Sequence, residues 1–162
     1  MAEPAPNDPH VLEPDHLPTP FTAAEIRDAS PAGLTLRLHH ESAAEPPFER
    51  VIRFVSVDAE GADRMTWRVG PDGALVDGHP GRSTWLAFQG HASMPADRTT
   101  RVREVIETPM GSLDCWRYTL SEGDATYDLW FALELPGMPI RTVETVGGEW
   151  RETMQMVSHD VT

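Results

Sequence analysis

Residues 125–139 read ATYDLWFALELPGMP, and this stretch indicates the fold most clearly. Large apolar side chains recur at every second residue, which is the period of a β-strand that buries one face. The residues expected on that face are Tyr127, Leu129, Phe131 and Leu133. Trp130 is expected on the opposite face. The Pro-Gly-Met-Pro sequence of residues 136–139 then ends the strand, because proline lacks the backbone N–H that a strand needs, and predicts the turn of a hairpin.

Segments with the same two-residue period follow one another along the chain. In LTLRLHHE (residues 34–41) every second residue is apolar until His40, as in a half-buried antiparallel strand. Seven more strands are predicted in residues 49–58, 64–70, 74–77, 99–108, 111–120, 140–147 and 149–159. Short strands joined by turns form an antiparallel sheet that curls to protect its edges. The predicted fold is α+β but mostly β: one strongly curved sheet, a half-barrel of about nine strands.

Two short helices are expected to cap the concave face of this sheet. In FTAAEIRDASPAG (residues 21–33), Thr22 and Glu25 have the spacing of a capping box, and Phe21 and Ile26 have that of a hydrophobic staple. Residues 81–95 interrupt the strand pattern, and Thr84 or the serine before it is available as a helix cap. This segment is predicted to be a short helix or a lid-like loop.

The chain length of 162 residues favours one domain, which we place at residues 21–162. Residues 1–20 hold six of the fifteen prolines, with acidic residues and histidines between them. Such a composition buries too little apolar surface to offset the entropy of the chain. A disordered or loosely draped proline-rich arm is therefore predicted for residues 1–20.

The charge of the chain excludes several classes of function. The formal net charge is −13, so nucleic acid and anionic membrane surfaces are not expected as partners. All 13 basic residues are arginine, and a chain without lysine cannot form a Schiff base through a lysine side chain. No apolar run approaches the roughly 18 residues that span a bilayer, so no stable membrane insertion is expected.

The N-terminal sequence and the single cysteine bear on location. No cationic residue precedes Arg27 and no apolar segment resembles a signal peptide, so we expect a cytoplasmic protein. Cys115 is the only cysteine, which leaves no partner for a disulfide within the chain. Its place in a strand pattern indicates a small buried apolar residue.

Histidines are the first candidates for chemistry. His39 and His40 are adjacent, with His79 and His91 further along the chain. Neighbouring residues of a strand point to opposite faces, so both members of the pair cannot bind one metal ion. We predict no metal site and no cofactor. His40, on the apolar face of its strand, is a candidate general base, and a structural or surface role is the alternative.

Asp114 is the second candidate for catalysis. It is expected to share one face of its strand with Trp116, Tyr118 and Leu120. An apolar setting of this kind raises the pKa of a carboxyl group. Asp128 on the following strand could approach it across the hairpin and complete an acid–base pair. The alternative is that both carboxylates lie in water near the strand ends.

Large apolar residues distributed over many elements are the third candidate. Tryptophan and methionine offer polarisable, adaptable surface for an apolar ligand. The residues predicted to line such a pocket are Trp67, Trp85, Phe88, Met94, Trp116, Trp130, Met138 and Met154. A filled core made of the same residues is the alternative.

Residues 111–160 resemble the end of the bacterial lipoprotein-carrier half-barrels. That superfamily includes the lipoprotein localisation factor and mycobacterial lipid-binding lipoproteins. The shared features are a strand that opens with Gly111, a strand with Trp130 at its centre before an LPGMP turn, and a hairpin closed by Gly147 and Gly148. The resemblance implies a curved sheet whose apolar concave face can hold an acyl chain or another apolar molecule. An export signal and a lipobox cysteine, which the carriers have, are not found here.

These observations lead to one expected function and two alternatives. We expect a binding or carrier-like module, not an enzyme, that holds a small hydrophobic ligand such as a lipid or apolar metabolite beneath residues 83–95. The first alternative is a small cofactor-independent enzyme, an isomerase or cyclase, that uses His40 or Asp114 in the same cavity. The second is a protein-interaction scaffold that uses its strand edges or acidic surface.

Overall fold

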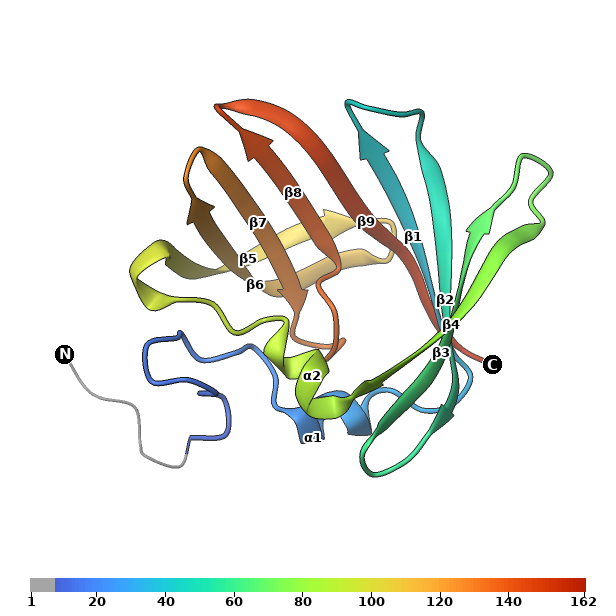
Figure 1. Cartoon of the computed structure of the whole chain (residues 1–162), viewed down its shortest axis with the longest axis horizontal. Coiled ribbons are helices and arrows are strands. Elements are labelled where there is room, and N and C mark those ends of the chain that lie inside the picture. The colour runs from blue at the N-terminus through green and yellow to red at the C-terminus, as the bar shows by residue number, and fades with distance from the viewer. Residues whose placement is uncertain (1–7) are drawn as a thin grey trace.

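The computed structural model describes residues 8–162, which form a nine-stranded antiparallel sheet with two short α-helices (Figure 1). The helices are α1 (Ala23–Asp28) and α2 (Trp85–Gly90), and a 3-10 turn, η1, spans Ala96–Arg98. The strands are β1 (Leu34–Ser42), β2 (Phe48–Val57), β3 (Gly61–Val69), β4 (Leu75–Thr84), β5 (Thr99–Thr108), β6 (Gly111–Glu122), β7 (Ala125–Ala132), β8 (Arg141–Val146) and β9 (Glu149–Val161).

The sheet consists of two meanders joined at its centre. Its strand order is β4-β3-β2-β1-β9-β8-β7-β6-β5, so β1 to β4 form one meander and β5 to β9 the other. The join is the antiparallel pair β1 and β9, in which Leu38 faces Met156 and His40 faces Met154. The edge strands β4 and β5 do not pair with each other, so the sheet is curved but open. The predicted half-barrel of about nine strands is confirmed.

The register of the sheet defines its concave face. Leu36 and Leu38 on β1 are buried, and directly paired residues of neighbouring strands share their face. Ile52 on β2 pairs with Leu36, and Met156 on β9 pairs with Leu38. The same face continues through β8 and β7, where Thr142 pairs with Met154 and Leu129 with Thr142. This face carries the core.

Helix α1 begins as its sequence predicts. The Thr22 hydroxyl accepts a hydrogen bond from the Glu25 backbone N–H, and the Glu25 carboxylate accepts one from the Thr22 N–H. Phe21 and Ile26, the predicted staple residues, are both buried in the core. Figure 1 shows α1 and α2 together on the open side of the sheet, between the two meanders.

The arm contacts the rest of the protein where the structure describes it. The Leu17 N–H donates to the Met94 carbonyl, and Thr19 is buried. The Gln89 side-chain amide of α2 donates to the carbonyl of Pro9 and to the hydroxyl of Thr19. The structure thus places residues 8–20 against α2, whose polar groups offset part of the loss of chain entropy, and the disorder or loose packing expected for the arm stays a prediction. The rest of the predicted arm, residues 1–7, lies outside the described residues.

Strand β4 is longer than the four residues predicted for it. It continues through Gly78, Pro80 and Gly81, which ordinarily end a strand. Proline is tolerated here because β4 is an edge strand, and an edge residue needs no N–H for a neighbour on its open side. Helix α2 follows at once, with the Thr84 hydroxyl accepting from the Ala87 N–H, as predicted for residues 81–95.

Candidate functional site

The loop that follows β7, residues 133–140, lies across the concave face and divides the space there. Its residues Leu135 to Met138 line one cavity and Met138 and Pro139 line another. Ile52 from the sheet also contributes to both. The stretch that predicted a strand and its stop thus has a further role, since its turn forms a wall between two hollows.

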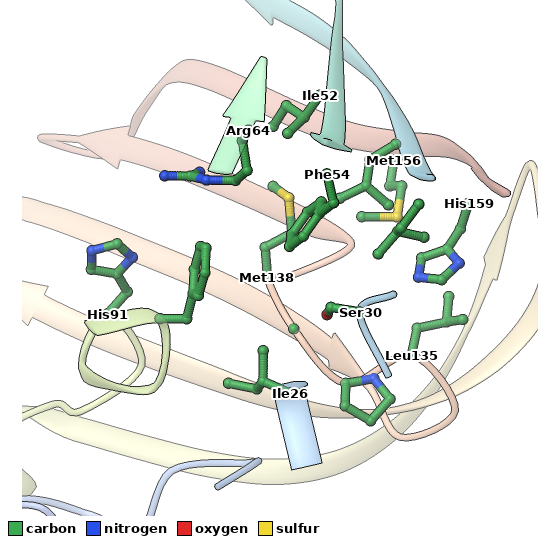
Figure 2. Close-up of a pocket in the computed structure, with 15 residues that line it drawn as sticks. Ile26, Ser30, Ile52, Phe54, Arg64, His91, Leu135, Met138, Met156 and His159 are labelled. Carbon is green, nitrogen blue, oxygen red and sulfur yellow. The ribbon is translucent and has the colours of Figure 1, made fainter. Parts of the chain in front are cut away.

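The first cavity is enclosed mainly by apolar side chains and has a volume of about 200 Å³. Figure 2 shows Met138, Phe54 and Met156 grouped around its centre, with Ile26 of α1 below them. Its remaining lining residues are Ser30, Leu34, Leu36, Ile52, Arg64, Phe88, His91, Leu135, Pro136, Gly137 and His159. No Asp or Glu is among the described residues that line it.

Arg64 is the charged residue of the first cavity. It pairs with Phe54 in the sheet, which places its side chain on the concave face. Its Nη2 donates to the Ser83 hydroxyl at 2.8 Å, and its guanidinium carbon lies 4.8 Å from the centre of the Phe88 ring. Its Nε atom is buried and has no hydrogen-bond partner among the described residues. Burial lowers the pKa of Arg64 from its usual value.

The second cavity, of about 460 Å³, is lined by more polar residues than the first. Apolar lining comes from Leu38, Ile52, Leu129, Met138, Pro139, Val143 and Met154. The polar lining residues are His40, Arg50, Tyr127, Thr142, Glu144 and Glu152. This cavity therefore offers carboxylates, an imidazole and a guanidinium group to a bound molecule, whereas the polar groups of the first are those of Ser30, Arg64 and two histidines.

His40 lies in the wall of the second cavity on the concave face, as its alternation predicts. Its ring stacks on Phe48 with 4.8 Å between the ring centres, and its Nε2 atom is buried without a partner among the described residues. Burial, followed by the charges of Arg50, His39 and Arg68, lowers the pKa of His40. The imidazole is therefore held in its neutral form at neutral pH.

Four of the residues predicted for the site meet around the two cavities. Phe88 lines the first, His40 and Met154 line the second, and Met138 lines both. Phe88 comes from α2, His40 and Met154 from paired strands at the centre of the sheet, and Met138 from the β7–β8 loop. Residues far apart in the sequence are thus brought together by the curvature of the sheet.

Three further predicted residues belong to the packed core and do not line either cavity. Trp85 is buried at the start of α2, where its Nε1 donates to the Asp58 carbonyl. Met94 is buried under the arm. Trp116 shares the face of Phe131 but is covered by the guanidinium groups of two arginines on β5.

The two remaining tryptophans point away from the cavities. Trp67 pairs with Val51, and Val51 pairs with Arg37, so all three lie on the convex face. Trp130 pairs with Arg117 and Arg141 on that face, and its ring is covered by both guanidinium groups. A lining role for Trp67 and Trp130 is contradicted by this geometry, because alternation turns both side chains outward.

The predicted acid pair does not form. Asp128 pairs with Thr119, which is five residues from Asp114 on β6, so the two carboxylates lie on opposite faces. Asp114 lies beyond the last β6 residue that pairs with β7, and its carboxylate forms an ion pair with Arg103. The apolar setting expected for Asp114 is replaced by a guanidinium group and partial exposure.

Among residues 8–162, no group of three or more His, Cys, Asp or Glu side chains has the geometry to hold a metal ion.

Sequence reasoning missed Arg64, Ile52 and Phe54 as cavity residues. In β3 the apolar residues Met65 and Trp67 alternate with charged and polar ones, which would ordinarily turn the apolar face inward. The structure has the opposite arrangement, because Arg64 pairs with the buried Phe54. Knowledge of the strand pairing would have been needed to see it.

Comparisons with known proteins identify a fold but no family. No family model matches the chain, and no curated protein matches it. Among solved structures, it is similar to a Bacteroides fragilis protein that is thought to be exported and has a YmcC-like fold. The TM-score is 0.51 at 9% sequence identity, over 81% of this chain and 97% of the other. The open, curved sheet is thus shared with a solved structure.

This likeness extends to the fold alone. The cytoplasmic location predicted from the sequence gains no support from a neighbour thought to be exported. No helix within residues 8–162 is both long and apolar enough to cross a bilayer.

Proposed function

We propose that this protein binds a small hydrophobic ligand, a lipid or an apolar metabolite, on the concave face of its sheet. The observation that carries the proposal is the pair of adjoining cavities, of about 200 and 460 Å³, beneath α2 and the β7–β8 loop. Protein interiors are close-packed and leave few voids larger than a water molecule. Hollows of this size with apolar walls are typical of ligand sites.

Ile52 and Met138 are the two described residues that line both hollows. Methionine is unbranched and changes its rotamer at low cost. We infer that a ligand longer than the first cavity displaces the Met138 side chain and extends into the second. The resemblance of residues 111–160 to the lipoprotein-carrier half-barrels supports an acyl chain as the ligand, held as those carriers hold theirs.

A cavity-filling variant tests the proposal. Binding of the neutral fluorescent probe N-phenylnaphthylamine is measured for the wild type and for Ile52→Phe, whose larger side chain enters both cavities. We expect at least about tenfold weaker binding by the variant, since an occupied pocket excludes the probe. The matched control is Val102→Phe, at an exposed site, which should bind as the wild type does.

Thermal unfolding of both variants shows whether each remains folded. Native mass spectrometry of the purified protein tests the same proposal without a probe, because a bound lipid adds its mass to the chain. Absence of probe binding by the wild type, together with a bare mass, would contradict the proposal.

One observation favours a second candidate function. We propose as the alternative a cofactor-independent enzyme, an isomerase or cyclase, in which His40 acts as the base. Its neutral, half-buried imidazole has a buried Nε2 without a partner among the described residues, in the wall of a cavity that also holds carboxylates. A small-molecule extract incubated with wild type and with His40→Gln would show a compound consumed only by the wild type. If no compound differs, the alternative is lost.

A further inference from the structure

Arg64 lies at one end of the first cavity, where apolar walls surround its charge. Figure 2 shows Arg64 and His91 on one side of the cavity and His159 and Leu135 on the other, with Met138 between them. The stem of Arg64 rises from β3, and Phe88 of α2 lies against the guanidinium group. A molecule in this cavity would therefore have a cationic group at one end and apolar side chains along its length.

The charge of Arg64 is not balanced by the protein. Seven arginines elsewhere pair with carboxylates at 4 Å or less: Arg27, Arg37, Arg68, Arg82, Arg98, Arg103 and Arg117. Arg64 makes no such ion pair within residues 8–162, although acidic residues outnumber basic ones by 26 to 13. Its one side-chain hydrogen bond is to the neutral hydroxyl of Ser83.

An unbalanced, partly buried guanidinium group carries an unfavourable desolvation energy unless an anion neutralises it. Arginine does not avoid this energy by losing its proton, because it stays protonated in proteins. Water reaches part of the group, but the Nε–H is buried and donates to nothing among the described residues. A planar oxyanion accepts hydrogen bonds from two N–H groups of one guanidinium at once.

We propose that Arg64 binds the anionic end of the ligand, which is therefore an amphiphile: an apolar chain that ends in a carboxylate or another oxyanion. This inference rests on the proposed function and narrows it. The apolar chain lies along Phe54 and Met138 and continues past Ile52. The absence of carboxylates from the described lining of this cavity favours an anion there, because no acidic side chain competes for the guanidinium group or repels the ligand.

Two probes that differ only at their polar end test the inference. Isothermal titration calorimetry is performed with dodecanoate below its micellar concentration and with dodecanol below its solubility limit, at a pH where the acid is ionised. We expect dodecanoate to bind about tenfold more tightly or better, which is the effect of one charge-assisted hydrogen bond. Dodecyl phosphate serves as a further arm, since a guanidinium group binds phosphate as well as carboxylate. Preference for either anion over the alcohol supports the inference.

The variant Arg64→Met keeps an unbranched apolar stem and removes the charge. We expect it to bind dodecanol as well as the wild type does and to lose the preference for dodecanoate. Arg64→Lys, which keeps the charge, should recover part of that preference. The matched control is Arg53→Met on the neighbouring strand, an exposed arginine of the convex face that pairs with Met65. It makes the same change of net charge and should leave the preference intact.

The outcomes separate this inference from the proposed function. Equal binding of dodecanoate and dodecanol by the wild type, or an undiminished preference in folded Arg64→Met, overturns the role of Arg64 but leaves a hydrophobic site. Failure of the wild type to bind any of the three probes overturns both.

Discussion

Two regions of the concave face are built from similar residues, yet one is solid and the other is hollow. In the filled half, around Tyr118 of β6 and Phe131 at the end of β7, both side chains are almost fully buried and pack edge to face with 5.5 Å between ring centres. In the hollow half, on β1 and β2, the equally apolar Leu36, Ile52 and Phe54 face a cavity. The composition of a face therefore does not decide whether it encloses space.

What differs is the segment that covers each half. Over the filled half, the end of the arm packs directly: the Tyr118 hydroxyl donates to the Pro18 carbonyl at 2.6 Å, and Phe21 meets Phe131 edge to face. Over the hollow half, α2 and the β7–β8 loop supply Phe88, Leu135 and Met138, which line the first cavity without filling it. A cover that does not fill the concave face leaves room for a ligand.

Cysteine labelling should show the largest difference between the halves. Cys115 lies on the same strand as Tyr118 but on its opposite face, so it reports on the packing of this half of the sheet as a whole. It is fully buried, and burial raises the pKa of its thiol to about 11. We expect it to react with iodoacetamide at least about a hundredfold more slowly in the folded protein than in denaturant, because a buried thiol must wait for an opening.

The variant Ile52→Cys places a second thiol in the hollow half. Mass spectrometry of the folded variant should find one label, at residue 52, and excess dodecanoate should slow that reaction. Rapid labelling of Cys115 in the native wild type would show that the filled half is not solid.

A matched pair of truncations should show a smaller but clear difference in stability. Phe131→Ala should lower the free energy of unfolding by about 3–5 kcal/mol, since it leaves a cavity in a packed region. Phe54→Ala should cost less, by about 1–2 kcal/mol, because part of the Phe54 ring already faces empty space and loses fewer contacts there. Urea unfolding of both variants measures the pair, and equal losses would abolish the distinction between the halves.

Removal of one hydroxyl group tests how the arm is held over the filled half. Tyr118→Phe removes the donor to the Pro18 carbonyl and should cost about 1–2 kcal/mol, since a buried acceptor is left without its partner. The arm should also be released, so limited proteolysis should cut residues 8–20 faster. Tyr127→Phe is a suitable control, because Tyr127 lines the open second cavity and makes no side-chain hydrogen bond to the arm. An unchanged cleavage rate in Tyr118→Phe would argue against this contact as the anchor.

Much of the fold could be predicted because it depends on local pattern. The alternation of residues 34–41, the capping box of Thr22 and Glu25, and the turn residues between strands each act over a few positions. The pairing of β1 with β9, the first strand with the last, could not be predicted in this way. It depends on contacts between residues more than a hundred positions apart, for which the turns give no register.

The site was predictable only where alternation and pairing agree. Phe88 and Met138 lie in segments that the sequence already marked as interruptions of the sheet, and both line the first cavity. Trp67 was assigned to the pocket for its size, yet its strand turns it outward and turns Arg64 inward. The contacts of residues 8–20 could not be predicted either, because they depend on Gln89, a polar partner distant in the sequence.

The smallest expected effect is a dependence of the free energy of unfolding on pH, which arises from His40 in the hollow half. Burial lowers the pKa of His40 below its ordinary value of 6.5, so the unfolded chain binds a proton at His40 more readily than the folded protein does. The contribution of His40 to the free energy of unfolding therefore does not change with pH above 6.5. The free energy of unfolding should fall as the pH drops from 6.5 through the lowered pKa. Because the ring is only half-buried, we expect less than about 1 kcal/mol.

In His40→Gln, which has no titrating group at this position, the free energy of unfolding measured in urea should no longer show this fall with pH. NMR titration of the His40 ring gives the pKa directly, and a value at or above 6.5 would contradict its burial in the cavity wall. A ligand that fills the second cavity should lower the pKa of His40 further, since it removes the remaining water from around the ring. A hollow that closes around its ligand would then come to resemble the filled half.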